Sequence, residues 1–232
     1  MDINKAIYQK ARNLGLNACE ISMHYYGWEK LGIQGIDRFQ KRLLKSPDQD
    51  VFRDHWLEGT YASKFAKSCI PVTYEPCGDE GPDLLICFGI KKAFIEVKHL
   101  RSEYDSNASS KKMVSWAIWN KLQQLISNEV NILIIHSDRD EISKSAFYKG
   151  IYLCKGYIKG KSLINKWANL SLIIIYMPFF DSAHNDPFYW RFLRTSRCKV
   201  PRSMRKQLKD FFKKQILIEH QKADQLPIAN TH

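Results

Sequence analysis

One short run of this sequence, residues 93–99, predicts a β-strand that carries charge where a strand is normally apolar. Side chains alternate between the two faces of a strand, so Glu96 and Lys98 share one face while Ile95 and Val97 lie on the other. We expect this strand to be buried, and acidic or lysine side chains rarely lose their water without a partner. The strand therefore predicts a polar site inside an otherwise apolar sheet.

A second carboxylate, Asp83, begins the preceding apolar run at residues 83–88. The two runs are expected to form adjacent strands, with residues 89–92 as the hairpin loop between them. This pairing would bring Asp83, Glu96 and Lys98 together. A divalent cation is the partner that best accommodates two carboxylates at once. The two strands therefore predict a site for a divalent cation.

The chain has 232 residues, of which 44% are hydrophobic, and we expect one α/β domain with appended helices. The order of its periodic segments is typical of a mixed β-sheet flanked by helices. The expected division is a helical extension at 1–50, a core at 51–190 and a basic helical tail at 191–232. The expected elements of the core are a helix at 52–68, strands at 72–75, 83–88 and 93–99, a loop at 101–110, a helix at 111–128, a strand at 130–136, a connecting segment at 143–167 and a strand at 170–177.

Most of the formal net charge of +12 lies near the C-terminus. Residues 191–214 hold ten Lys or Arg and one acid, Asp210, and their apolar residues follow helical spacing. A helix with a basic face suits phosphate contact, although a calmodulin-type helix, a membrane-surface helix or a merely solvated face would have the same pattern. The residues expected to bind nucleic acid are Arg191, Arg194, Arg197, Lys199, Arg202, Arg205, Lys206 and Lys209.

The six cysteines are scattered without a C-x-x-C pair, so a zinc site is not expected. The N-terminus has no apolar signal core, and the longest apolar run, 172–180, is interrupted by Pro178 and too short to span a bilayer. We therefore expect a cytoplasmic protein with reduced thiols and no membrane partner.

A third carboxylate is expected on the helix at 52–68. At 100° per residue, Glu58 falls on the same side as Tyr61 and Phe65, which places an acid on the inward face. Asp54, one turn earlier, is the alternative. Glu58 is the preferred candidate because an inward carboxylate requires a partner.

The segment Pro82-Asp83 followed by Glu96-Val97-Lys98, with an acid on the preceding helix, resembles the PD-(D/E)xK nuclease superfamily. This fold is shared by restriction endonucleases and archaeal Holliday-junction resolvases. The resemblance covers about residues 52–136, and the strand at 170–177 fits the later part of the family's sheet. It implies a restriction-endonuclease-like core and Mg²⁺-dependent hydrolysis of DNA phosphodiester bonds, with Mn²⁺ able to substitute.

The resemblance also implies a role for each site residue. Asp83, Glu96 and Glu58 would ligate the metal, and the backbone carbonyl of Val97 would supply a further ligand. Lys98 would orient or help to deprotonate the attacking water and stabilise the charge that develops on the phosphoryl group. Loss of Lys98 is therefore expected to impair turnover more than binding.

Several members of the family carry a glutamine near the metal, on the helix that follows the lysine strand. Gln123 and Gln124 both occupy suitable positions here, and helical spacing does not separate them. Both are therefore retained as supporting residues of the active site.

Two other functions fit the same residues. The chain could be a non-catalytic nucleic-acid-binding module whose E-x-K strand is only a charged face, or a nuclease that acts on RNA. The preferred partner is DNA, either double-stranded or branched. Cutting two strands often needs two active sites, so a homodimer is compatible with the sequence, which leaves the oligomeric state open.

Overall fold

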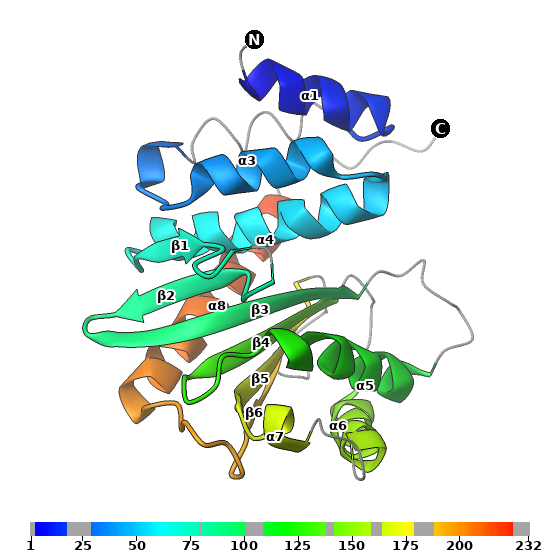
Figure 1. The fold of residues 1–232 in the computed structure, drawn as a ribbon, viewed down its shortest axis with the longest axis vertical. Helices are drawn as coiled ribbons and strands as arrows, with labels where there is room; N and C mark the ends of the chain where they lie inside the picture. The colour runs from blue at the N-terminus through cyan, green and yellow to red at the C-terminus, as the bar shows by residue number, and fades with distance from the viewer. Residues whose placement is uncertain are drawn as a thin grey trace.

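A computed structural model shows a six-stranded sheet covered by helices on both faces (Figure 1). The strands follow the order β1-β2-β3-β4-β5-β6, which is also their order along the chain. The structure describes residues 3–17, 29–78, 80–100, 109–137, 142–158, 164–178 and 188–224, without the side chains of 164 and 220–224.

The sheet is mixed. β3 and β4, and likewise β4 and β5, are parallel neighbours, whereas the remaining pairs of adjacent strands are antiparallel. A two-residue turn at Gly89 and Ile90 joins β2 to β3, and Gly89 has φ 62°, a value that suits glycine. The strands are β1 (Val72–Tyr74), β2 (Leu84–Phe88), β3 (Lys91–Leu100), β4 (Asn131–Ser137), β5 (Leu170–Tyr176) and β6 (Phe188–Phe192).

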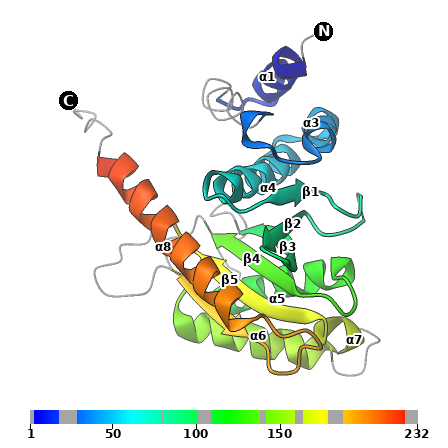
Figure 2. The same ribbon diagram turned by 90° about the vertical axis from the view of Figure 1, so that its left-hand side faces the viewer.

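Helices from distant parts of the chain form the two outer layers. One face of the sheet packs against α4 and α8, and the other packs against α5 and α6 (Figure 2). Parallel strands require long crossover connections, and α5 and α6 supply them. The helices are α1 (Ile3–Asn13), α3 (Ile36–Lys45), α4 (Gln49–Lys67), α5 (Ser110–Lys121), α6 (Lys144–Ile158), α7 (Ile164–Trp167) and α8 (Arg202–Asp224), with short 3₁₀ turns η1 (Glu29–Leu31) and η2 (Leu122–Gln124).

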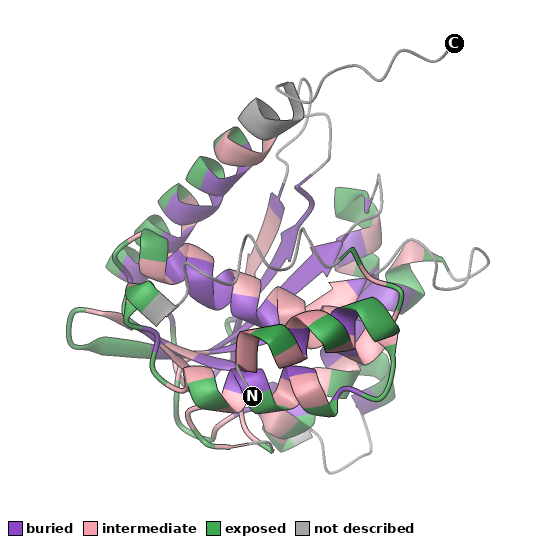
Figure 3. Ribbon diagram, turned by 90° about the horizontal axis from the view of Figure 1, so that it is seen from above, coloured by how far each residue is buried: buried purple, intermediate pink, exposed green. Residues whose placement is uncertain are grey.

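The central strands β4 and β5 are buried along their whole length (Figure 3). Both are rich in isoleucine because both of their faces meet a helical layer, so neither strand needs a polar side. Ile134 and Ile174 pack towards α8, whereas Ile135 and Ile175 pack towards α5 and α6. Burying each such side chain contributes roughly 1.5–3 kcal/mol, so these two strands anchor the fold.

The expected α/β class, with a mixed sheet flanked by helices, is confirmed. Two details differ from the expectation: the helix expected at 111–128 ends at Lys121, and β6 was not expected. The connecting segment at 143–167, to which no element was assigned, contains α6. The loop expected at 101–110 lies almost entirely outside the described residues.

The basic tail is more closely joined to the core than its expected boundary suggests. The division at 190/191 falls inside β6, which pairs with β5 from Phe188 to Phe192. Leu208 and Phe212 of α8 are buried in the same cluster as the sheet. None of the described helices combines the length and the apolar character needed to cross a membrane.

Candidate metal and catalytic site

Asp83 and Glu96 meet at the junction of β2 and β3. The antiparallel register pairs Leu84 with Ile95, so Asp83, one residue before β2, lies opposite Glu96. The Val97 N–H donates a hydrogen bond of 2.7 Å to Asp83 Oδ2 and fixes this carboxylate against β3. Both acids are almost completely buried, with exposed fractions of 2% for Asp83 and 1% for Glu96. Asp83 and Glu96 therefore lie opposite each other as a buried pair, as the sequence predicts.

Lys121, which the sequence did not identify, neutralises this pair. Its Nζ lies 2.8 Å from Glu96 Oε2 and 3.1 Å from Asp83 Oδ2. It is the last residue of α5 and follows the buried Ala117 and Ile118 by four and three positions. This spacing places Lys121 on the inward side of the helix. The same spacing in the sequence could have marked Lys121 as a buried lysine.

Lys98 lies on the same face of β3 as Glu96. In the register with β4, Glu96 pairs with Leu133 and Lys98 with Ile135, and both partners face the α5 and α6 layer. Lys98 is half-buried and forms no ion pair with any carboxylate of the described residues. Its ammonium is therefore not used to neutralise the carboxylate pair, a task that Lys121 performs.

Glu58 belongs to an adjoining network of charges. Its Oε2 accepts a hydrogen bond of 2.7 Å from the Tyr74 hydroxyl and lies 3.3 Å from Nη1 of Arg42. The same Arg42 nitrogen lies 2.6 Å from Glu75 Oε1. The alternative acid, Asp54, is more exposed and lies 3.6 Å from Nδ1 of His99. Of the two acids considered, Glu58 is the buried one.

Burial and mutual repulsion disfavour the ionised forms of two of these acids. Burial first, and then the negative charge of Asp83, raise the pKa of Glu58 to about 8 and that of Glu96 to about 9. Burial opposes the charge of Lys121, but Asp83, Glu96 and Glu58 outweigh it and raise the pKa of the ammonium. Among the described residues, the acids of the site are therefore not fully neutralised by the nearby cations, which is the electrostatic condition that favours a bound cation.

The donor set of this site suits a small divalent cation. Glu96 Oε1 is buried and accepts no hydrogen bond from the described residues, while Lys121 contacts Oε2. Within the described ranges, no group of three His, Cys, Asp or Glu side chains converges as a ready-made metal site. Mg²⁺ is commonly held by one or two carboxylates and keeps several waters, so Asp83 and Glu96 fit this mode of binding.

The remaining expected site residues lie at different distances from the carboxylate pair. Gln123 and Gln124 follow Lys121 in η2, where Gln123 is exposed and Gln124 half-buried. Neither side chain forms a hydrogen bond to the described carboxylates. The backbone N–H of Val97 donates to Asp83, whereas the resemblance implies that the backbone carbonyl of Val97 ligates the metal.

The basic residues gather at the opposite edge of the sheet. Across the strands, the pairs Glu96–Leu133, Leu133–Ile173 and Ile173–Arg191 form one row, so Arg191 lies three strands from Glu96. The other basic residues expected to bind nucleic acid lie on α8 or in the segment before it. The structure therefore keeps these basic residues apart from the carboxylate pair.

Arg42 is expected to stabilise the folded chain through Glu58 and Glu75. In Arg42→Met, two buried carboxylates lose their shared cation, and we expect the free energy of unfolding to fall by about 2 kcal/mol at pH 7.5, as measured by urea denaturation. Lys41→Met, at an exposed neighbouring position, is the matched control and should change it by less than about 0.5 kcal/mol. Equal stabilities of Arg42→Met and the control would show that the network contributes little.

Glu96 should make stability depend on pH. Its pKa is about 9 in the folded chain against an ordinary 4.5, so between these values the folded state retains a proton that the unfolded state has released. The free energy of unfolding consequently falls as pH rises through this range. In EDTA, Glu96→Gln should differ little from the parent near pH 4.5. At pH 8.5 it should melt higher by on the order of 10 °C, because four pH units above the ordinary pKa correspond to about 5 kcal/mol. Identical differences at both pH values, as expected for the exposed control Glu129→Gln, would contradict this.

Comparison of the chain with protein-family models, curated proteins and solved structures gave no match. The fold and the site must therefore support any functional conclusion by themselves. What they define is a mixed α/β sheet with a buried carboxylate pair where β2 and β3 meet, and a basic region at the far edge of the same sheet.

Proposed function

We propose that this chain is a metal-dependent endonuclease with a restriction-endonuclease-like core, related to the PD-(D/E)xK superfamily, that hydrolyses DNA phosphodiester bonds. One observation carries the proposal: Asp83 and Glu96 are buried side by side, with Lys98 on the face of Glu96. A buried pair of carboxylates does not stabilise a sheet by itself. Metal-dependent phosphodiester hydrolysis, in contrast, uses acids that hold a cation beside an ammonium group.

Each residue has a distinct task in this proposal. Asp83 and Glu96 would hold Mg²⁺, or Mn²⁺ in its place, and the backbone carbonyl of Val97 would add an oxygen ligand. When bound, the ion would supply an activated water and neutralise charge on the phosphoryl oxygens. Lys98 would orient the attacking water and stabilise the negative charge that develops on the phosphoryl group. Glu58, held by Tyr74 and Arg42, would ligate the ion or lie beside it once its proton is released, and Gln123 or Gln124 would support the site from η2.

Lys121 introduces a condition on metal binding. Its ammonium contacts both carboxylates that the proposal assigns to the metal. Two positive charges beside the same two acids repel each other, so Lys121 would have to move away from them when an ion binds there. In the metal-free chain it serves as a substitute cation that keeps the two carboxylates together, and this explains how an acid pair remains buried without metal.

The second candidate function is a non-catalytic nucleic-acid-binding module. The observation that favours it is the same Lys121, because an ammonium that already pairs with both acids resembles a structural ion pair. In that case the basic residues of β6 and α8 would bind DNA or RNA, and the carboxylates would only join α5 to the sheet.

Metal titration separates the two functions. Calorimetric titration of Mg²⁺ and Mn²⁺ into the parent chain should show binding that is lost in Asp83→Asn. Asp37→Asn, which removes an exposed acid on α3, is the charge-matched control and should bind as the parent does. Binding that survives Asp83→Asn, or no binding by the parent at millimolar metal, would favour the non-catalytic module.

A further inference from the structure

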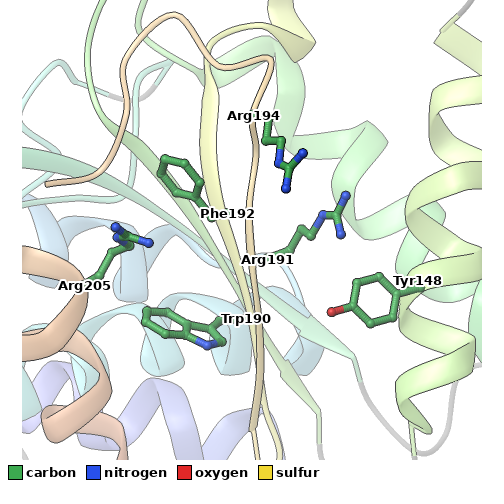
Figure 4. A pocket seen from close by; sticks show the side chains of 6 residues that line it. All are labelled: Tyr148, Trp190, Arg191, Phe192, Arg194 and Arg205. Carbon is green, nitrogen blue, oxygen red and sulfur yellow. The ribbon is translucent and has the colours of Figure 1, made fainter. Parts of the chain in front are cut away.

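A hollow of about 490 Å³ lies at the β6 edge of the sheet, outside the carboxylate site. Side chains on both sides of the strand enclose it, with the Trp190 and Phe192 side chains on one side and that of Arg191 on the other (Figure 4). Among the described residues, its lining combines three guanidinium groups with three aromatic rings and includes no acid. The lining residues are Tyr148, Trp190, Arg191, Phe192, Arg194 and Arg205.

The cations of this hollow are held by rings rather than by carboxylates. The Arg205 guanidinium lies 4.8 Å from the centre of the Phe192 ring, and that of Arg191 lies 5.4 Å from the Tyr148 ring. The Nε atoms of both arginines are buried and have no hydrogen-bond partner among the described residues. Each guanidinium therefore lies against an aromatic ring, and neither forms an ion pair with a carboxylate of the described residues, so the hollow suits an anion.

A second hollow continues this surface along α8. It shares Trp190 and Arg205 with the first and is also lined by Arg202, Lys206 and Lys209. Lys209 Nζ lies 5.8 Å from the centre of the Trp190 ring. The first turn of α8 contains no acid, so the partial positive charge of the helix N-terminus adds to that of the side chains. The two hollows together form a basic track with aromatic rings along it.

We propose that this track, named here the β6 track, binds a single-stranded segment of nucleic acid, with an unpaired nucleotide in the hollow of about 490 Å³. Phosphates would contact the arginines, and bases would stack on the aromatic rings. Contact with a duplex backbone requires only surface cations, because the bases of a duplex are paired and cannot stack on aromatic rings in a hollow. An acidic peptide would use the cations but not the ring faces. The combination of both features therefore favours unpaired nucleotides.

The substrate class inferred from the β6 track rests on the proposed nuclease activity. Arg191 lies in the same cross-strand row as Glu96, three strands away, which corresponds to about 14 Å at an interstrand spacing of about 4.8 Å. A site so placed holds the substrate away from the cutting residues. The substrate class that suits the enzyme is therefore DNA that joins a duplex to a single-stranded segment, such as an overhang, flap or gap.

Binding in EDTA tests the β6 track without any contribution from cleavage. Fluorescence anisotropy at 0.15 M salt would compare a labelled single-stranded oligonucleotide with a blunt duplex of the same sequence. The variants Arg191→Lys and Arg205→Lys keep the net charge but lose the stacked planar fork. Arg194→Ala, at an exposed position, tests the hollow without disturbing the core. Lys213→Ala removes an exposed charge of α8 that lines neither hollow and serves as the control.

The parent should bind the single strand at least fivefold more tightly than the duplex. Each of the three variants should weaken single-strand binding by about tenfold, the size expected when stacking or a phosphate contact is lost, whereas Lys213→Ala should change it less than twofold. Equal or tighter binding of the duplex would overturn the proposal, as would equal binding of polyglutamate or unchanged affinity in all three variants. A failure here leaves metal binding by Asp83 unaffected, so the two proposals are tested separately.

Discussion

Lys98→Ala is expected to lower the rate of metal-dependent DNA cleavage by about 10²–10⁴-fold, the range typical of a lost general acid or base. The ammonium lies on the face of Glu96 and forms no ion pair with a described carboxylate, so its charge is available to the reaction. It contributes no ligand oxygen, and the affinity for Mg²⁺ should therefore stay within about twofold of the parent. Single-turnover cleavage and calorimetric metal titration measure the two effects.

The matched control is Lys92→Ala. Lys92 is an exposed lysine near the start of β3, on the same face of the strand as Lys98. It should cut at the rate of the parent chain. If Lys98→Ala cuts as fast as Lys92→Ala, the lysine has no catalytic role. If both variants lose activity equally, the effect is one of general charge rather than of the site.

Lys121→Met is expected to lower the free energy of unfolding of the metal-free chain by about 3–5 kcal/mol at pH 7.5, the cost of removing one partner of a buried ion pair. The buried acids Asp83 and Glu96 would then both lose the ammonium that contacts them. Mg²⁺ should restore most of this loss, because the ion no longer competes with Lys121. Urea denaturation with and without Mg²⁺ measures both effects.

Lys112→Met changes an exposed lysine of the same helix and should leave stability within about 0.5 kcal/mol of the parent. The decisive comparison is the gain that Mg²⁺ confers. A larger gain in Lys121→Met than in the parent would show that ammonium and metal compete for the same oxygens. A smaller gain would mean that Lys121 supports metal binding, and the substitute-cation role would then be wrong.

The local part of this site could be predicted from the sequence. Strand alternation places Glu96 and Lys98 on one face, and a short hairpin brings Asp83 opposite Glu96. Both relations depend on residues fewer than twenty positions apart. Helical spacing likewise predicts Glu58 on a buried face of α4, and the structure confirms this position.

The remainder depends on contacts between distant segments. Lys121 meets Asp83 across 38 positions, and nothing near either residue specifies that distance. Arg42 reaches Glu58 and Glu75 from α3, a helix whose function the sequence pattern did not indicate. The sequence pattern does not set β6 apart because its Arg191 also opens the run of basic residues near the C-terminus, although Phe188–Phe192 is an aromatic run of the kind that forms edge strands.

The most direct measurement is single-turnover cleavage of a DNA panel by the parent chain and by Asp83→Asn, each with Mg²⁺ and with EDTA. The panel contains single-stranded, blunt duplex, overhang, flap and branched DNA. We expect the parent to cut at least one of these DNAs with Mg²⁺ and none with EDTA, and Asp83→Asn to cut none. Absence of cleavage by the parent on the whole panel with either Mg²⁺ or Mn²⁺, or undiminished cleavage by Asp83→Asn, would contradict the assignment of a nuclease.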